Sequence, residues 1–201
     1  MFYGASAFNQ DLGWCVGDGV DLDDAFDDTQ CASTYCGVMW ETNTGDCDVS
    51  RTGNVMVSWK IRQAVAAWLS DATAAEATYG HISTWDTSGV TDMESLFDVD
   101  YNSGAASFNE DISAWDTSGV TNMRGMFRSA SSFNQTLGSW QVDKVTSMAN
   151  MFQDAGVFNQ DIGDWDVTSV TAMYSMFQKA LAFNQDLGDW RIGSVKSISF
   201  M

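Results

Sequence analysis

A period of 25 residues runs through the second half of this chain and limits what the chain can fold into. A representative unit is FNQDIGDWDVTSVTAMYSMFQKALA, residues 158–182. Phe and Trp recur at fixed places in the unit, as Phe108, Phe133, Phe158, Phe183, Trp115, Trp140, Trp165 and Trp190. A unit of this size cannot bury its own Trp, Phe and Met side chains, so successive units must stack and share one core.

Each unit changes its hydrophobic periodicity once. The motif I-x-x-W-x-V at 162–167 alternates Trp with Val, which is the spacing of a β-strand. The motif V-x-x-M-x-x-M-F at 170–177 then follows helical spacing. The unit before Phe108 is longer by five residues, and its insertion around 99–107 is predicted to be a loop. The pattern predicts an α/β solenoid over 81–201, with about five repeats of short strands and short helices.

The repeat resembles that of a known family. The motif I-x-x-W-x-V is similar to the L-x-x-L-x-L of leucine-rich repeats, and FNQDIGDWDVTSVTAMYSMF more narrowly resembles the BspA-type surface repeats of bacteria, mycoplasmas and some protists. The match spans residues 82–201, and residues 1–16 with one residue missing. The resemblance implies a right-handed leucine-rich-repeat-like solenoid on a secreted or cell-surface protein, with adhesive or interaction roles and no reaction.

Residues 55–80 break the repeat and are predicted to form a helical N-terminal cap. Apolar residues lie at helical spacing from Ile61 to Leu69, with Ser58 as a candidate N-cap and Gly80 as a candidate stop. Such a helix would cover the open edge of the first repeat, which a stack of repeats otherwise exposes. The alternative is an amphipathic helix that binds a partner.

Residues 1–40 contain one repeat followed by a degenerate copy. Val16 and Phe26 keep the spacing that the later units use between their Val and Phe. The segment 1–40 is therefore predicted to be the final repeat and the disulfide-stapled C-terminal cap of one solenoid module, and 41–54 to be a linker. This order places a closing cap ahead of an opening cap.

Four cysteines in the N-terminal part of the chain predict a local staple; they are Cys15, Cys31, Cys36 and Cys47. Two disulfides formed in an oxidising compartment explain this clustering, and the sequence leaves three connectivities open. Zinc is the alternative, but the spacing offers no C-x-x-C pair and His81 is the only histidine.

The two ends of the sequence fit one repeat. Met201 holds the place that Met176 holds in the unit before, and reading Met201 on into Phe2 continues the repeat without a break. This predicts head-to-tail extension, either as consecutive modules of one polypeptide or as separate chains that stack. The alternative is that the sequence is a piece cut from a longer protein. The predicted end-to-end interface comprises Met1, Phe2, Phe8, Trp14, Trp190, Ile198, Phe200 and Met201.

The charge of the chain excludes some partners. The net charge is −18, whereas nucleic acids and anionic membranes both require a basic surface. No apolar run reaches the length of a transmembrane helix, so membrane insertion is not expected. The cysteines and the resemblance indicate an extracellular or cell-surface location. No signal peptide opens the sequence, so such a location requires a targeting segment outside it.

The sequence gives little support for catalysis. His81 is the only candidate base for a nucleophile, and acid pairs such as Asp164 and Asp166 recur by repeat position rather than forming one unique pair. The sequence contains no phosphate-binding or dinucleotide-binding fingerprint. We therefore expect a protein without enzymatic activity and without catalytic residues.

One row of residues is predicted to line the concave face of the solenoid. If the Trp and Val of W-x-V turn inward, the residue between them turns outward. The row comprises Asp86, Asp116, Gln141, Asp166 and Arg191. Asp86, Asp116 and Asp166 are weak candidate ligands for Ca²⁺, although Gln141 and Arg191 interrupt the row and no D-x-D-x-D-G loop is present; the acidic run 18–28 is a second weak candidate. No other cofactor is expected.

A second row is predicted to be a ladder of asparagines that satisfies buried backbone groups. Its members are Asn109, Asn134, Asn159 and Asn184. Asn134 also begins the glycosylation sequon Asn134-Gln135-Thr136, but an asparagine that points inward leaves no room for a sugar.

The sequence as a whole predicts a non-enzymatic extracellular protein with a structural or adhesive role that tiles head to tail, as tandem modules or as a filament. The alternative is a discrete module that binds a surface protein or a glycan through its acidic concave face, with Ca²⁺ as a possible requirement. Concentration-dependent polymers would favour the first prediction, and a monomer with a saturable ligand the second.

Overall fold

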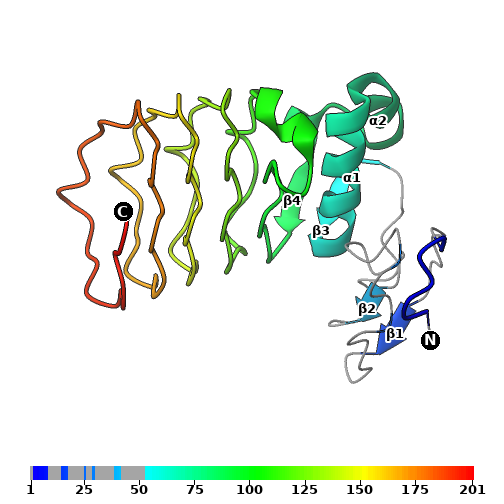
Figure 1. The fold of residues 1–201 in the computed structure, drawn as a ribbon, viewed down its shortest axis with the longest axis horizontal. Helices are drawn as coiled ribbons and strands as arrows, with labels where there is room; N and C mark the ends of the chain where they lie inside the picture. Colours follow the sequence, from blue (N-terminus) through cyan, green and yellow to red (C-terminus); the bar gives the residue numbers. More distant parts are fainter. Residues whose placement is uncertain (1, 9–14, 18–24, 26–28, 30–38, 42–52) are drawn as a thin grey trace. The chain divides into compact units, whose positions relative to one another are not determined.

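The structure is a computed structural model of the 201-residue chain that describes residues 2–8, 15–17, 25, 29, 39–41 and 53–201 (Figure 1). The chain divides into two compact units, Met1–Arg51 and Thr52–Met201. The boundary lies within 41–54, the segment predicted to be a linker. Each unit is described by itself.

The described part of the first unit contains two short strands that pair in parallel. β1 (Cys15–Gly17) lies beside β2 (Met39–Glu41), with Cys15 opposite Met39. The predicted disulfides fall outside the described residues, because only the backbone of Cys15 is described and the other three cysteines are not.

The second unit begins with a strand and two helices. β3 (Val55–Val57) leads into α1 (Ser58–Ser70), which is followed by α2 (Ala72–Tyr79). The predicted helix therefore breaks at Asp71, whose extended backbone ends α1 and whose side chain accepts the N–H of Ala74 at 3.1 Å as the N-cap of α2.

The predicted helix limits are right at one end only. Gly80 ends α2 with φ 75°, a backbone conformation that favours glycine. Ser58 is not the N-cap of α1, because it is already the first helical residue; its hydroxyl instead accepts the N–H of Thr91 at 3.0 Å. Ser58 thus ties α1 to the first coil of the stack.

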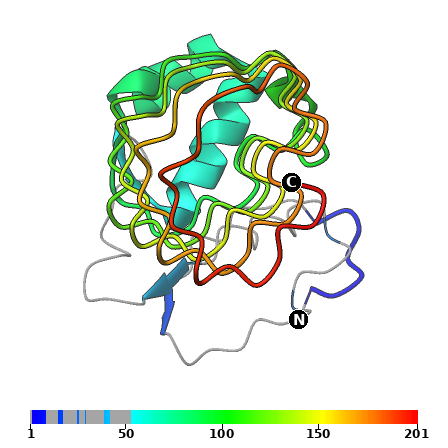
Figure 2. The ribbon, with the colours of Figure 1, turned by 90° about the vertical axis from the view of Figure 1, so that its left-hand side faces the viewer.

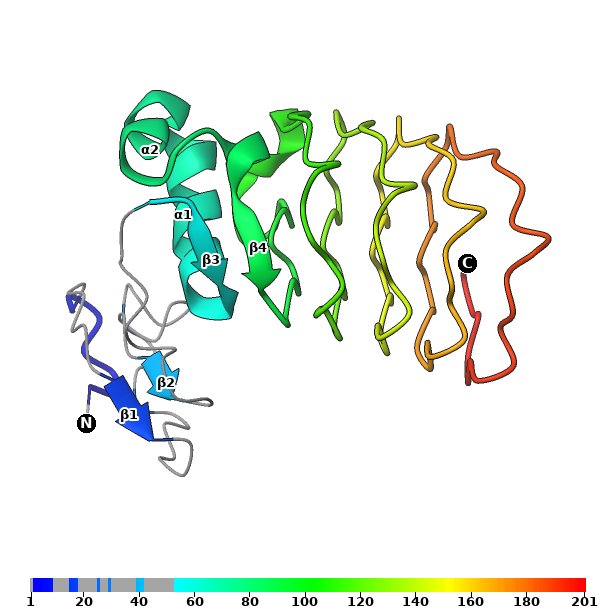
Figure 3. The same ribbon diagram turned by 180° about the vertical axis from the view of Figure 1, so that it is seen from behind.

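α1 lies across the first coil at one end of the stack (Figure 3). Its buried face comprises Lys60, Ile61, Ala64, Val65 and Trp68. The inserted segment forms a short 3₁₀-helix, η4 (Ser103–Ser107), and packs tightly on α1. A Cβ added at Gly104 would lie 2.5 Å from the carbonyl oxygen of Leu69, so only glycine fits there.

The rest of the unit is a stack of coils, one for each repeat (Figures 1 and 2). The first coil contains the 3₁₀-helix η3 (Ile82–Thr84) and β4 (Asp86–Gly89), which pairs in parallel with β3. Between later coils, parallel bridges join Asn122 to Ser147 and Ser147 to Ala172. These bridges lie in the Thr-x-Met part of the repeat.

The W-x-V segments form a strand only in the first coil, which differs from the prediction. In the later coils this part of the chain folds into turns, with the N–H of Trp165 donated to Ile162 at 3.2 Å and that of Val170 to Val167 at 3.0 Å. The first coil makes the same two bonds, from Trp85 to Ile82 and from Val90 to Thr87, so its strand depends on the pairing of β4 with β3.

The short helices predicted for each repeat are also not present in the described coils. In the motif V-x-x-M-x-x-M-F, amide groups donate to the next coil instead of four residues back, as in Phe152 to Met176 at 2.9 Å. Asn150 lies in this motif with φ 59°, in the left-handed region, which interrupts a right-handed helix. Helical spacing of buried residues here reflects a chain of turns.

The core consists of aromatic columns that run through the stack. Phe127, Phe152 and Phe177 follow one another with ring centroids 5.6 and 5.8 Å apart, and Trp115 and Trp140 are 6.5 Å apart. The indole N–H groups bond to the coil before, as in Trp140 donating to the carbonyl of Ile112 at 3.2 Å. From the second coil on, the indole N–H of each Trp therefore finds its acceptor because the coils stack.

Candidate functional site

The last coil, residues 177–201, ends the stack with an exposed apolar face. Figure 2 looks onto this end of the stack, with the last coil in red foremost among the coils. Ile198 is 51% exposed and Met201 42% exposed, whereas Met173 and Met176, at the same places in the coil before, are 0% exposed. The contrast identifies the apolar surface that a further coil would cover.

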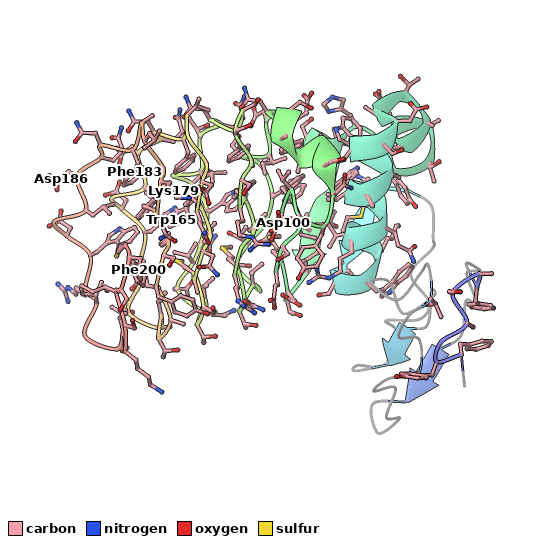
Figure 4. The ribbon with its side chains drawn as sticks, in the orientation of Figure 1. Asp100, Trp165, Lys179, Phe183, Asp186 and Phe200 are labelled. Carbon is pink, nitrogen blue, oxygen red and sulfur yellow. The ribbon has the colours of Figure 1, made fainter. Side chains whose placement is uncertain are left out.

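Phe200 stands out within this face. Figure 4 labels Phe200 on the last coil. Its side chain is 74% exposed and its backbone has φ 57°. Asn150 and Ser175 hold the same place in earlier coils with φ 59° and 56°. The left-handed backbone is therefore a feature of the repeat, and Phe200 differs in placing a bulky side chain where the earlier coils have a small or polar residue.

Hydrogen bonding between coils also stops at the last coil. Ser175 donates its N–H to the carbonyl of Ser199 at 2.8 Å, and Lys196 donates to the carbonyl of Thr171 at 3.0 Å. The Phe200 N–H and the Lys196 carbonyl, at the equivalent places one coil on, make no hydrogen bond to any other residue in the described part of the chain. Unpaired edge groups of this kind favour pairing with another chain segment.

The segment 2–8 has the same local structure as one corner of the coils. Phe2 accepts the N–H of Ala5 at 2.9 Å, and Ala5 accepts the N–H of Phe8 at 2.8 Å. In the last coil, the corresponding bonds are 2.9 and 3.0 Å long. The rings of Phe2 and Phe8 stack at 4.3 Å, compared with 4.0 Å for Phe177 and Phe183.

Of the predicted end-to-end interface, Met1 and Trp14 lie outside the described residues, and Trp190 is half-buried in the last coil. Trp190 donates its indole N–H to the carbonyl of Ile162 at 3.1 Å and so continues the Trp column.

Gly4 in the segment 2–8 holds the place that Lys179 holds at the same corner of the last coil. Their backbones match, with φ 71° for Gly4 and 59° for Lys179.

The predicted concave row is exposed in every coil. Its members are Asp86, Asp116, Gln141, Asp166 and Arg191. The first four alternate with buried residues, whereas Arg191 lies between the half-buried Trp190 and the exposed Ile192. Asp166 accepts the hydroxyl of Thr168 at 2.6 Å and its N–H at 3.0 Å. These bonds lower the pKa of Asp166, and bonds from Ser118 likewise lower the pKa of Asp116.

The candidate Ca²⁺ ligands do not form a set. The carboxylates of Asp86, Asp116 and Asp166 each bond to the residue two places on in their own coil. Across the described residues, no group of three or more His, Cys, Asp or Glu side chains is placed to hold a metal ion. The second candidate, the acidic run 18–28, lies outside the described residues apart from Ala25.

A shallow pocket lies beside the row where the last two coils meet. Its volume is about 280 Å³, and its charged lining comes from Asp164, Asp166, Asp189 and Arg191. The pocket places three carboxylates beside one guanidinium, which suits a ligand that carries a cationic group.

The predicted asparagine row does form a ladder, but at the surface. The Oδ1 atoms of Asn109, Asn134 and Asn159 each accept the N–H of the next asparagine in the row at 2.8–2.9 Å. A glutamine adds a second rung, as in Gln160, whose Nε2 donates to the carbonyl and to Oδ1 of Asn134 at 2.9 Å. The expectation that these asparagines point inward is wrong for Asn134, which is exposed.

The sequence prediction missed a set of ion pairs between the first coils. Arg128 bonds to Asp98, whose side chain is 2% exposed, at 2.8 Å and also to Asp100. Arg124 pairs with Glu94 at 3.1 Å. The five-residue insertion places these partners about thirty residues apart, so the 25-residue offset does not align them.

His81 has structural partners. Its Nδ1 lies 2.8 Å from the Ser83 hydroxyl and accepts the Ser83 N–H at 3.3 Å, and its ring packs edge-on against Trp68 at 5.0 Å. These contacts hold the junction between α2 and the first coil.

The stack and its columns define a repeat protein. Two overlapping parts of the chain, residues 64–168 and 100–201, match the family described as "Mycoplasma protein of unknown function, DUF285". Because these matches cover more than half of the chain, the chain belongs to this family. No curated protein and no solved structure matches it.

Within the described residues, none of the helices has the length and apolar character needed to cross a membrane.

Proposed function

We propose that this chain is a non-enzymatic repeat protein of the BspA-type, leucine-rich-repeat-like solenoid class, and that it acts outside the cell or on its surface as a structural or adhesive element. In this proposal a second copy of the chain extends the stack head to tail. Its segment 2–8 adds the next corner onto the last coil of the first copy.

The match between the last coil and the segment 2–8 carries the proposal. Phe158 and Phe183 are 6.0 Å apart, and Phe152 and Phe177 are 5.8 Å apart. The stacked pair in 2–8 already has the geometry needed to continue both columns by one step. It would cover apolar surface that the last coil leaves exposed, and each fully buried aromatic side chain contributes roughly 2–3 kcal/mol.

Charge complementarity supports a second copy as the partner. The last coil carries three basic residues, Lys179, Arg191 and Lys196, against two acidic ones, Asp186 and Asp189. The segment 1–51 carries ten acidic residues and one basic residue. In a chain with a net charge of −18, the last coil is therefore a favourable place for the acidic N-terminal part of another copy.

The test is the state of assembly of the purified chain. Light scattering after size-exclusion chromatography should show polymers that grow with concentration, and electron microscopy should show linear particles. Phe200→Asp should abolish them, because a charge would enter the apolar contact. Tyr101→Asp is the matched control, since Tyr101 is 75% exposed on the inserted loop away from this face. A wild-type chain that stays at 22.0 kDa at every concentration would refute the proposal.

The pocket favours a second candidate function, a module that binds a surface protein or glycan bearing a cationic group. Here Asp164→Asn and Asp189→Asn together should remove binding of basic ligands, such as lysine-rich peptides or amino sugars, while leaving assembly unchanged. Unchanged binding in this variant would exclude the pocket as the site.

A further inference from the structure

One coil departs from the repeat at a single place on its exposed corner. Asp111, Asp161 and Asp186 hold equivalent positions, and each accepts the N–H two residues later at 2.8–3.0 Å. In the first coil this position is His81, whose Nδ1 accepts the Ser83 N–H at 3.3 Å. In the coil between those of Asp111 and Asp161 it is Thr136, which makes no hydrogen bond to any other described residue. Thr136 gives up a local bond that the other four coils keep.

The same exchange creates a recognition sequence. Thr136 turns Asn134-Gln135-Thr136 into the only Asn-x-Ser/Thr sequence in the chain. Asn109, Asn159 and Asn184 are each followed by aspartate at the corresponding place. A coil that loses a structural bond and gains an acceptor sequence in one substitution suggests a modification at Asn134.

The structure removes the steric objection to a sugar at this position. Asn134 and Thr136 are exposed, while Phe133 and Leu137 on either side are 0% exposed and fix the corner to the core. Within the described part of the chain, Asn134 bonds through its backbone and through Oδ1, and its Nδ2 donates no hydrogen bond.

We propose that Asn134 carries an N-linked glycan. A glycan on Nδ2 leaves Oδ1 free to accept the N–H of Asn159 and the Nε2 of Gln160, both at 2.9 Å, so the ladder is compatible with the modification. The row of asparagines runs along the side of the stack. The glycan would therefore cover that side and leave the end face of the last coil open.

The reaction is the transfer of an oligosaccharide from a lipid pyrophosphate donor by a transferase of the secretory route. The Asn134 nitrogen forms a bond to C1 of the first sugar, and the bond from C1 to the phosphate oxygen breaks. The lipid pyrophosphate leaves with the electron pair, and the amide gives one proton to a base of the transferase. This inference rests on the proposed extracellular location, since the donor and transferase act on exported chains.

The first test is mass spectrometry of the protein from its native source. Cleavage after Arg128 and Lys144 releases residues 129–144, which contain the sequon. The peptide should carry a hexosamine-containing glycan. Peptide-N-glycosidase in heavy-oxygen water should remove the glycan and convert Asn134 to a labelled aspartate. An unmodified peptide from surface-exposed protein would overturn the proposal and leave the proposed function standing, whereas a protein that is not exported would contradict the proposed location as well.

Matched variants expressed in secreting cells test the geometry. Thr136→Asp restores the residue of three other coils and should abolish the glycan without loss of thermal stability, while Thr136→Ser should retain it. Asp161→Thr creates the same sequence one coil further on and should add a second glycan. Absence of glycan from both the wild-type chain and the Thr136→Ser variant would overturn the proposal.

Discussion

The Phe columns allow a sharp test of how the coils share their stability. Phe152 is 0% exposed in the middle of the stack, where its ring lies 3.9 Å from Phe158, 5.6 Å from Phe127 and 5.8 Å from Phe177. Phe152→Ala removes a buried ring from three neighbours and should lower the free energy of unfolding by about 3–5 kcal/mol. Phe183 is half-buried at the end of the stack, and Phe183→Ala should cost roughly half as much in the monomer.

The assay is urea unfolding followed by tryptophan fluorescence, at a concentration where the chain is monomeric. The m-value scales with the surface that becomes exposed on unfolding, so it should stay unchanged for Phe183→Ala. For Phe152→Ala it should fall if the coils beyond Phe152 unfold separately from the rest of the stack. Equal losses for the two variants would refute the view that coils are stabilised by neighbours on both sides. In assembled protein a second copy would cover Phe183, so the losses in free energy of unfolding for Phe183→Ala and Phe152→Ala should become more alike.

Three further predictions follow from individual side chains. Asn159→Ala removes the Oδ1 that two groups of the next coil share and should cost about 1–2 kcal/mol by thermal unfolding. Asn184→Ala should cost less, because the Asn184 Oδ1 accepts no bond from the described residues; equal losses would count against the ladder. The lowered pKa of Asp166 means that the folded state favours its carboxylate, so its contribution to stability is present at neutral pH and is lost as the pH falls below about 4. Asp166→Asn should therefore flatten the acid side of a plot of melting temperature against pH, and an unchanged acid side would contradict this reasoning. Arg128→Ala leaves the buried Asp98 carboxylate without its guanidinium and should lower the free energy of unfolding by more than about 2 kcal/mol, whereas Arg124→Ala, whose pair with Glu94 is exposed, should lower it by less than about 1 kcal/mol. Chemical denaturation measures both losses, and equal losses would refute this ranking.

Local periodicity in the sequence was sufficient to predict which side chains lie inside. Trp165 and Val167 are 4% and 1% exposed, and Asp166 between them is exposed, as an alternating pattern requires. The sequence also indicated the row of asparagines, because a polar residue at a fixed place in every repeat suggests a repeated bond. It did not reveal that this row lies at the surface.

The backbone conformation was harder to predict, because spacing alone does not say where an amide finds its acceptor. The Met and Phe residues of each repeat follow helical spacing, yet the Phe152 N–H bonds to Met176 in the next coil. That partner exists only once the coils have stacked, so the choice between a helix and a chain of turns is made by tertiary contacts. The same holds for Asp71, where one extended residue divides a segment that the pattern predicted to be a single helix.

The period, the residues that fill the core and the places where the repeat changes can be predicted from the sequence, because they depend on the order of apolar and polar side chains. Which face stays exposed and which polar atoms remain without a hydrogen bond depends on how the coils stack. Ile198 and Phe200 are exposed because no coil among the described residues covers them. The Asn134 Nδ2 is free of hydrogen bonds to the described residues because its Oδ1 and backbone alone form the ladder. Both outcomes are set by neighbours that are 25 residues or more away in the chain and adjacent only in the stack.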